Sequence, residues 1–123
     1  MKAKPVFLLN TIVGIIFGIG LMFVPEMLLD FLEVTYLDGG PAMARHTASW
    51  ILAGALFAFL VRDEEHSSLR QSVFFTYALS YVLMTIVELY GYLMGMTNVL
   101  MWGIIGLHVL MGVLFAYLFL TNR

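Results

Sequence analysis

Four long apolar segments follow one another along the chain, and only short polar stretches separate them. They cover residues 6–24, 41–61, 70–95 and 99–120. The shortest has 19 residues, which is enough for an α-helix to cross roughly 30 Å of hydrocarbon at about 1.5 Å per residue. The first segment is too long for the apolar core of a signal peptide, and no small-residue cleavage site precedes Pro25. We therefore interpret all four segments as membrane spans.

A shorter pattern lies between the first two spans. After Pro25, which ends the first span, residues 26–34 place acidic side chains on one side of a helix and apolar side chains on the other. The acidic ones are Glu26, Asp30 and Glu33, and the apolar ones are Met27, Leu28, Phe31 and Leu32. Such a helix lies in the plane of a membrane interface. The predicted fold is an all-α bundle of four transmembrane helices with a short amphipathic interfacial helix, in a single domain of residues 1–123.

The composition supports a membrane protein and excludes several other classes. Hydrophobic residues make up 62% of the chain and charged residues 11%, with a mean hydropathy of +0.96, whereas soluble proteins carry about 25% charged residues. The net charge of -2 and the lack of a Lys- or Arg-rich run exclude a nucleic-acid partner. The chain has no cysteine, which excludes disulfides, thiolate metal sites and cysteine nucleophiles. The predicted partner is membrane lipid.

The basic residues predict how the spans are oriented. With four spans, nearly all of them fall on one side, and only Arg45 falls near the other. The residues on the first side are Lys2, Lys4, Arg62, Arg70 and Arg123. Cytoplasmic loops carry an excess of Lys and Arg. Both termini are therefore predicted to be cytoplasmic.

A polar line runs down one side of the third span. Its members are Tyr77, Tyr81, Thr85, Glu88 and Tyr92, spaced 4, 4, 3 and 4 residues apart. This spacing places them on one face of an α-helix. A carboxylate at membrane depth faces the interior of a bundle or a wet cavity and finds a partner there. Functional reasoning therefore begins from Glu88.

Two other spans supply groups at a similar depth. Arg45 in the second span lies at nearly the same level as Glu88, so we predict that the two form a bidentate ion pair. His108 in the fourth span lies about one turn deeper, level with Thr85 and near Tyr81. A hydrogen bond to either hydroxyl would hold the His108 ring neutral.

These polar groups together predict a pocket in the outward half of the membrane. Its predicted lining is Arg45, Tyr81, Thr85, Glu88 and His108. Asn10 in the first span can close the polar line from the cytoplasmic side. A continuing line of hydroxyl groups favours a cavity, since a lock on helix register needs only one or two partners. We expect a small non-enzymatic membrane protein that binds a small polar or amphiphilic ligand.

Three alternatives stay open. Buried polar groups also hold helices in register, which would make the chain a structural or accessory subunit. A homo-oligomer formed through the glycine faces of the first or fourth span, such as Gly14 and Gly18, would allow proton-coupled transport. His108, Glu88 and the tyrosines can also perform acid–base chemistry on a lipid. No nucleophile motif and no carboxylate pair within a span marks such an enzyme.

The sequence predicts no cofactor. His46, Glu88 and His108 lie on different helices and show neither H-x-x-x-H nor E-x-x-H spacing, the local pattern that aims two ligands at one ion. The alternative is a haem held by His108, or a metal held by His46, Glu88 or His108.

Two short motifs carry a resemblance to known proteins. The glycine-rich first span ends in FVPEMLL at residues 23–29, and MAR at residues 43–45 opens a span of small residues. Over residues 14–62 the chain resembles a broad group of small, uncharacterised four-helix membrane proteins of bacteria and archaea. It departs from them at Glu33, where members commonly have glycine, and at Ala48 and Ser49. The resemblance implies a four-helix bundle in a prokaryotic plasma membrane, with Arg45 in a repeated role and no catalytic residue.

Overall fold

Five helices and no strands make up residues 2–122, the part of the chain that the computed structural model describes. The long helices are α1 (Ala3–Phe23), α3 (Gly40–Leu60), α4 (Ser68–Leu93) and α5 (Met101–Thr121), and the short one is α2 (Pro25–Phe31). All four long helices are long and apolar enough to cross a membrane, which confirms the four apolar helices predicted. The largest difference in their limits is at the start of α1, which begins at Ala3 rather than at residue 6.

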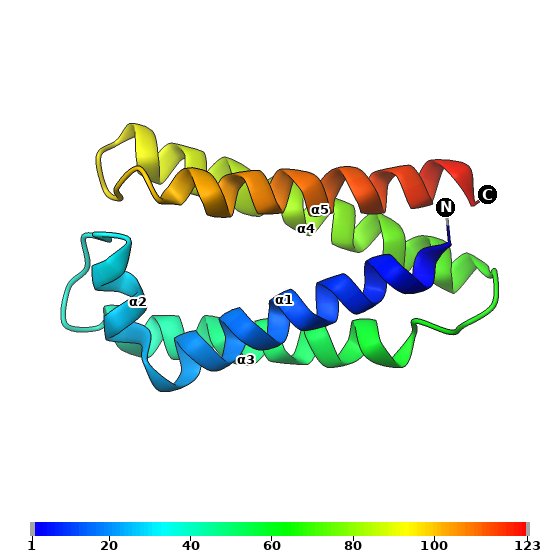
Figure 1. Ribbon diagram of the computed structural model, residues 1–123, viewed down its shortest axis with the longest axis horizontal. Coiled ribbons are helices and arrows are strands. Elements are labelled where there is room, and N and C mark those ends of the chain that lie inside the picture. The colour runs from blue at the N-terminus through cyan, green and yellow to red at the C-terminus, as the bar shows by residue number, and fades with distance from the viewer. Residues whose placement is uncertain (1, 123) are drawn as a thin grey trace.

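The long helices form two antiparallel pairs (Figure 1). α1 packs along α3, and α4 packs along α5. The two pairs meet where α1 contacts α5, whereas no Cα atom of α3 comes within 8 Å of a Cα atom of α4. The two ends of the chain lie at the same end of the bundle (Figure 1). We call this the terminal end, and we call the opposite end, which carries α2, the distal end.

A packed core fills the terminal end. Phe7 of α1, Phe74 of α4 and Phe115 of α5 are completely buried there. The ring centroid of Phe7 lies 5.6 Å from that of Phe74 and 5.7 Å from that of Phe115. Tyr77 stacks on Phe115 at 4.7 Å. Because these rings hold the two helix pairs together at the terminal end, the pairs can stand further apart at the distal end.

Glycine lets α1 and α3 approach each other closely. A Cβ atom placed on Gly14 would lie 2.8 Å from the Cβ atom of Ala55, and one placed on Gly18 would lie 2.6 Å from the Leu52 side chain. The G-x-x-x-G pair is therefore used within the chain, and this face of α1 is not open to a second copy. On α5, Gly106 has no described atom within 4 Å of such a Cβ. Association through the fourth span stays a prediction.

α2 and α4 end in the same kind of turn. After α2 the Val34 N–H donates to the Leu29 carbonyl, and after α4 the Met96 N–H donates to the Gly91 carbonyl, both at 2.9 Å. This is the hydrogen bond of a Schellman motif. The residue in the left-handed conformation is Glu33 after α2, with φ 50°, and Gly95 after α4, with φ 70°. Glycine adopts this conformation without strain, and glutamate does not. Glu33 is the position where the resembled proteins commonly have glycine.

We expect Glu33→Gly to raise the free energy of unfolding by about 1 kcal/mol and Gly95→Ala to lower it by about 1 kcal/mol, because a left-handed residue with a Cβ costs about 1–2 kcal/mol. The measurement is unfolding by dodecyl sulfate in mixed micelles, followed by tryptophan fluorescence. Gly103 in α5 is the control, since no described atom lies within 4 Å of a Cβ added there, and Gly103→Ala should raise the free energy of unfolding rather than lower it because alanine favours a helix. A loss of stability in Glu33→Gly would contradict the expectation.

Hydrogen bonds join these two turns across the distal end. The Thr35 N–H donates to the Met96 carbonyl at 3.0 Å, and the Asn98 N–H donates to the Leu32 carbonyl at 2.9 Å. The Asn98 side-chain amide also donates to the Phe31 carbonyl at 2.9 Å. The end of α2 is thereby tied to the loop between α4 and α5.

The short helix is shorter than predicted. It covers Pro25–Phe31 instead of residues 26–34, because the chain turns at Glu33. Leu28, Leu29 and Leu32 line the interior of the bundle and cover its distal end. Met27 and Phe31, which were predicted to share the apolar side with Leu28 and Leu32, are 62% and 63% exposed instead. The position of α2 in a membrane interface stays a prediction.

Charged residues gather at the terminal end. Lys4 Nζ lies 2.7 Å from a carboxylate oxygen of Asp63, and Arg62 Nε lies 3.2 Å from the other oxygen. The hydrogen bond from Lys4 lowers the pKa of Asp63. Lys2 and Arg70 line the same surface depression. Four of the basic residues used for the orientation thus share one end of the bundle, and the cytoplasmic placement of that end stays a prediction.

Candidate functional site

A cavity of about 420 Å³ lies in the distal half of the bundle, between the two helix pairs. All five helices contribute to its lining, which is mostly apolar. Apolar side chains in it include Phe17, Leu21, Leu29, Ile51, Met84 and Ile104. The polar side chains in it are Thr47, Tyr81, Glu88 and His108. This central cavity is therefore an apolar chamber with a small polar group on the wall that α4 and α5 form.

Glu88 of α4 and His108 of α5 are partners. His108 Nδ1 lies 2.8 Å from Glu88 Oε1 and 2.9 Å from Oε2. The histidine side chain is 15% exposed and the glutamate side chain 18%. When the Glu88 carboxylate is ionised it only accepts hydrogen bonds, so Nδ1 must then carry the proton, and in a neutral ring Nε2 is an acceptor. The hydrogen bonds of the His108 ring within residues 2–122 are those of Nδ1 to Glu88.

Tyr81 connects this pair to the first span. Its hydroxyl donates to Asn10 Oδ1 at 2.6 Å, and its ring centroid lies 5.4 Å from that of His108. Asn10 is 4% exposed, so its side chain depends on this contact. One turn earlier on α4, the Tyr77 hydroxyl donates to the Gly54 carbonyl of α3 at 2.6 Å. Along α4 the polar line therefore contacts α3 at Tyr77, α1 at Tyr81 and α5 at Glu88.

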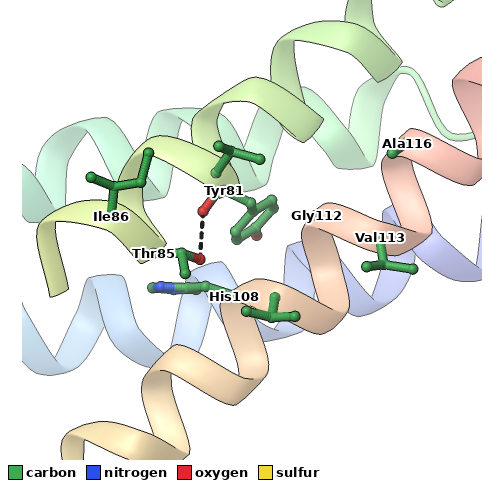
Figure 2. A pocket seen from close by; sticks show the side chains of 9 residues that line it. Tyr81, Thr85, Ile86, His108, Gly112, Val113 and Ala116 are labelled. Carbon is green, nitrogen blue, oxygen red and sulfur yellow. Dashed lines mark hydrogen bonds between the residues drawn. The ribbon is translucent and has the colours of Figure 1, made fainter. Parts of the chain in front are cut away.

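Thr85 lies on a different surface. Its hydroxyl donates to the Tyr81 carbonyl of its own helix at 2.8 Å. It lines a groove of about 280 Å³ between α4 and α5, together with Tyr81, His108 and Gly112. Figure 2 shows these side chains and the hydrogen bond from Thr85. His108 thus borders both the central cavity and this α4–α5 groove, and Thr85 borders only the groove.

The predicted pair of Arg45 and Glu88 is wrong. Arg45 lies 3.2 Å and 3.3 Å from the two carboxylate oxygens of Glu26 in α2, with both side chains close to half exposed. Nearby, the Tyr36 hydroxyl donates to Asp30 at 2.8 Å, which raises the pKa of Tyr36. Arg45 cannot reach Glu88 because α3 packs on α1 and stands apart from α4. Equal depth does not make two residues neighbours.

The sequence contains a pattern that points to His108 as the partner of Glu88. α4 and α5 are joined by a short connection around residue 97, and Glu88 and His108 lie at similar distances before and after it. In a helical hairpin, such positions come level with each other. The leucines of α2 and the amide of Asn98, which close the distal end, had no comparable signal.

The arrangement of His, Asp and Glu side chains gives no metal site in the part of the chain that the structure describes. Within residues 2–122, no three His, Asp or Glu side chains lie close enough together to hold a metal ion, and His46 is exposed on α3. No family model, no curated protein and no solved structure matches the chain.

Proposed function

We propose that this protein is an integral membrane protein that binds an amphiphilic molecule in the central cavity, with the polar head of the ligand on Glu88 and His108. The observation that supports this most is the cavity itself, an apolar chamber of about 420 Å³ lined by every helix. Ligand sites typically enclose about 300–1,000 Å³ and combine an apolar lining with a few convergent polar groups.

The polar wall favours a head group that donates a hydrogen bond. His108 Nε2 is an acceptor when Nδ1 donates to Glu88. A hydroxyl head can donate to Nε2 without bringing a charge into the chamber. A carboxylate head would bring a second negative charge close to Glu88, at a cost in free energy. We therefore expect a neutral hydroxyl-bearing amphiphile to bind better than a fatty acid of the same length.

In this proposal the four long helices cross the membrane and α2 lies at its outer interface. Four crossings place both termini on the same side, and Lys2, Lys4, Arg62 and Arg70 make that side cytoplasmic by the positive-inside rule. The central cavity then lies in the outer half of the bilayer. Arg45 and Glu26 lie beside the outer head groups.

A structural role is the second candidate, and the polar contacts favour it. Three part-buried polar side chains on α4 have a partner on another helix. These contacts are Tyr77 with Gly54, Tyr81 with Asn10, and Glu88 with His108. Such contacts stabilise membrane helix pairs by about 0.6–2 kcal/mol. A subunit whose polar groups only fix packing would need no ligand.

Binding of matched amphiphiles separates the two candidates. We expect native mass spectrometry of the protein in detergent to show a bound molecule with hexadecanol and less with palmitate, because the two share a chain and the palmitate head brings a negative charge close to Glu88. The variant with both Glu88→Leu and His108→Leu should lose hexadecanol. Arg45→Gln should keep it, because Arg45 lies outside the cavity lining. Equal binding of hexadecanol by the double variant and the wild type would contradict the proposal.

A further inference from the structure

We propose that the central cavity is filled from the bilayer, through the gap between α3 and α4, and that the alkyl chain of the ligand lies in this gap while its head is at His108. The inference rests on the proposed function and adds to it the route of entry and the ligand class, a lipid-dissolved single-chain amphiphile.

The gap lies on the open flank of the bundle. On one flank α1 contacts α5, and on the other no Cα atoms of α3 and α4 come within 8 Å. A groove of about 720 Å³ occupies this second flank. Trp50 and Phe57, which line it, are 71% and 46% exposed. The groove therefore opens onto a surface that faces lipid when the helices cross a membrane.

The groove continues inward to the central cavity. A chamber of about 230 Å³ lies between α1, α3 and α4. It shares Trp50, Gly54 and Ser80 with the outer groove. It shares Thr47 and Tyr81 with the central cavity. The three spaces therefore border one another in sequence, from the lipid-facing surface to the chamber that holds His108, and in this proposal they form one passage.

The walls of the passage suit an alkyl chain better than a file of water molecules. The hydroxyl groups of Ser80, Thr76 and Thr47 each donate to a carbonyl four residues earlier on their own helix, at 2.8, 2.8 and 3.0 Å. The Tyr77 hydroxyl donates to the Gly54 carbonyl. Because these hydroxyl groups already donate to backbone carbonyls, the passage offers few free hydrogen-bond donors to water molecules.

The route from the aqueous side is closed by contrast. Two backbone hydrogen bonds join the turn after α2 to the loop after α4, at 3.0 and 2.9 Å. The side chain of Asn98 adds a third at 2.9 Å, and the leucines of α2 lie beneath them. A water-borne ligand would have to break these three hydrogen bonds, whereas between α3 and α4 a lipid-borne chain has only to pass the single hydrogen bond from the Tyr77 hydroxyl to the Gly54 carbonyl.

A side chain added at Gly54 tests the route. No described atom lies within 4 Å of a Cβ on Gly54, so Gly54→Phe should fold and fill the passage. We expect its affinity for hexadecanol to fall by about tenfold or more, because the ligand chain and the phenyl ring compete for one space. Its affinity for hexanol, whose short chain fits in the central cavity, should stay close to that of the wild type. Gly106→Phe, on the open face of α5, is the matched control and should change neither.

A photoreactive probe locates the chain directly. In phosphatidylcholine vesicles, hexadecanol with a diazirine at the end of its chain should label the passage at Trp50 or Ser80. Labelling of the turns at Met96 or Glu33 instead, or an unchanged hexadecanol affinity in Gly54→Phe, would overturn the route while leaving the cavity as a binding site. A wild-type protein that binds neither alcohol would overturn the proposed function itself.

Discussion

His108→Leu should lower the free energy of unfolding by about 3 kcal/mol, because it leaves Glu88 without a partner in the interior of the bundle. The variant that also carries Glu88→Leu should recover most of this loss, since two leucines need no hydrogen-bond partners there. Unfolding by dodecyl sulfate, followed by the fluorescence of Trp50 and Trp102, measures both.

The exposed pair at the distal end is the control for this experiment. Arg45 and Glu26 are each close to half exposed, and exposed pairs contribute about 0–1 kcal/mol. Arg45→Gln should therefore have a small effect. If His108→Leu and the double variant lose the same stability, the loss comes from the imidazole packing and not from an unpaired carboxylate. If the double variant is as stable as the wild type but binds no hexadecanol, the pair serves binding rather than packing.

Gly14→Ile should destabilise the packing of α1 on α3 by about 3 kcal/mol, because an overfilled contact forces the two backbones apart. A Cβ at this position already lies 2.8 Å from the Cβ of Ala55, which cannot rotate away. The expected effect at Gly18 is smaller, since the atom that a Cβ meets there belongs to the flexible side chain of Leu52. The same dodecyl sulfate titration measures both variants.

A compensating change makes the second prediction specific. Gly14→Ala combined with Ala55→Gly keeps one methyl group at the contact, so the pair should be closer to wild-type stability than Gly14→Ala alone. Gly106→Ile on the open face of α5 should leave the stability of the monomer nearly unchanged. A change of size in detergent for Gly106→Ile, with stability intact, would support association through the fourth span. Failure of the Ala55→Gly rescue would mean that Gly14 is needed for a reason other than this contact.

The site was predictable only in part. The helical spacing of the third span places Tyr81 and Glu88 on its inward face, and both lie on the wall of the central cavity together with His108. Thr85 is turned far enough around α4 to face the neighbouring groove. The prediction that Arg45 pairs with Glu88 used only the depth of each residue along its helix, and depth carries no information about which helices are adjacent. The neighbours of Arg45 depend on the packing of α3, which lies against α1 and not against α4.

The sequence alone determined four apolar helices, their limits to within a few residues and the inward face of the third, because length, hydropathy and helical spacing are properties of each segment by itself. Only the tertiary structure decided which helices are neighbours. Small residues bring α1 against α3, and aromatic rings join the pairs at the terminal end, so the distal half is left hollow. The partners of Arg45 and Glu88, the shape of the cavity and the open flank between α3 and α4 all follow from that packing.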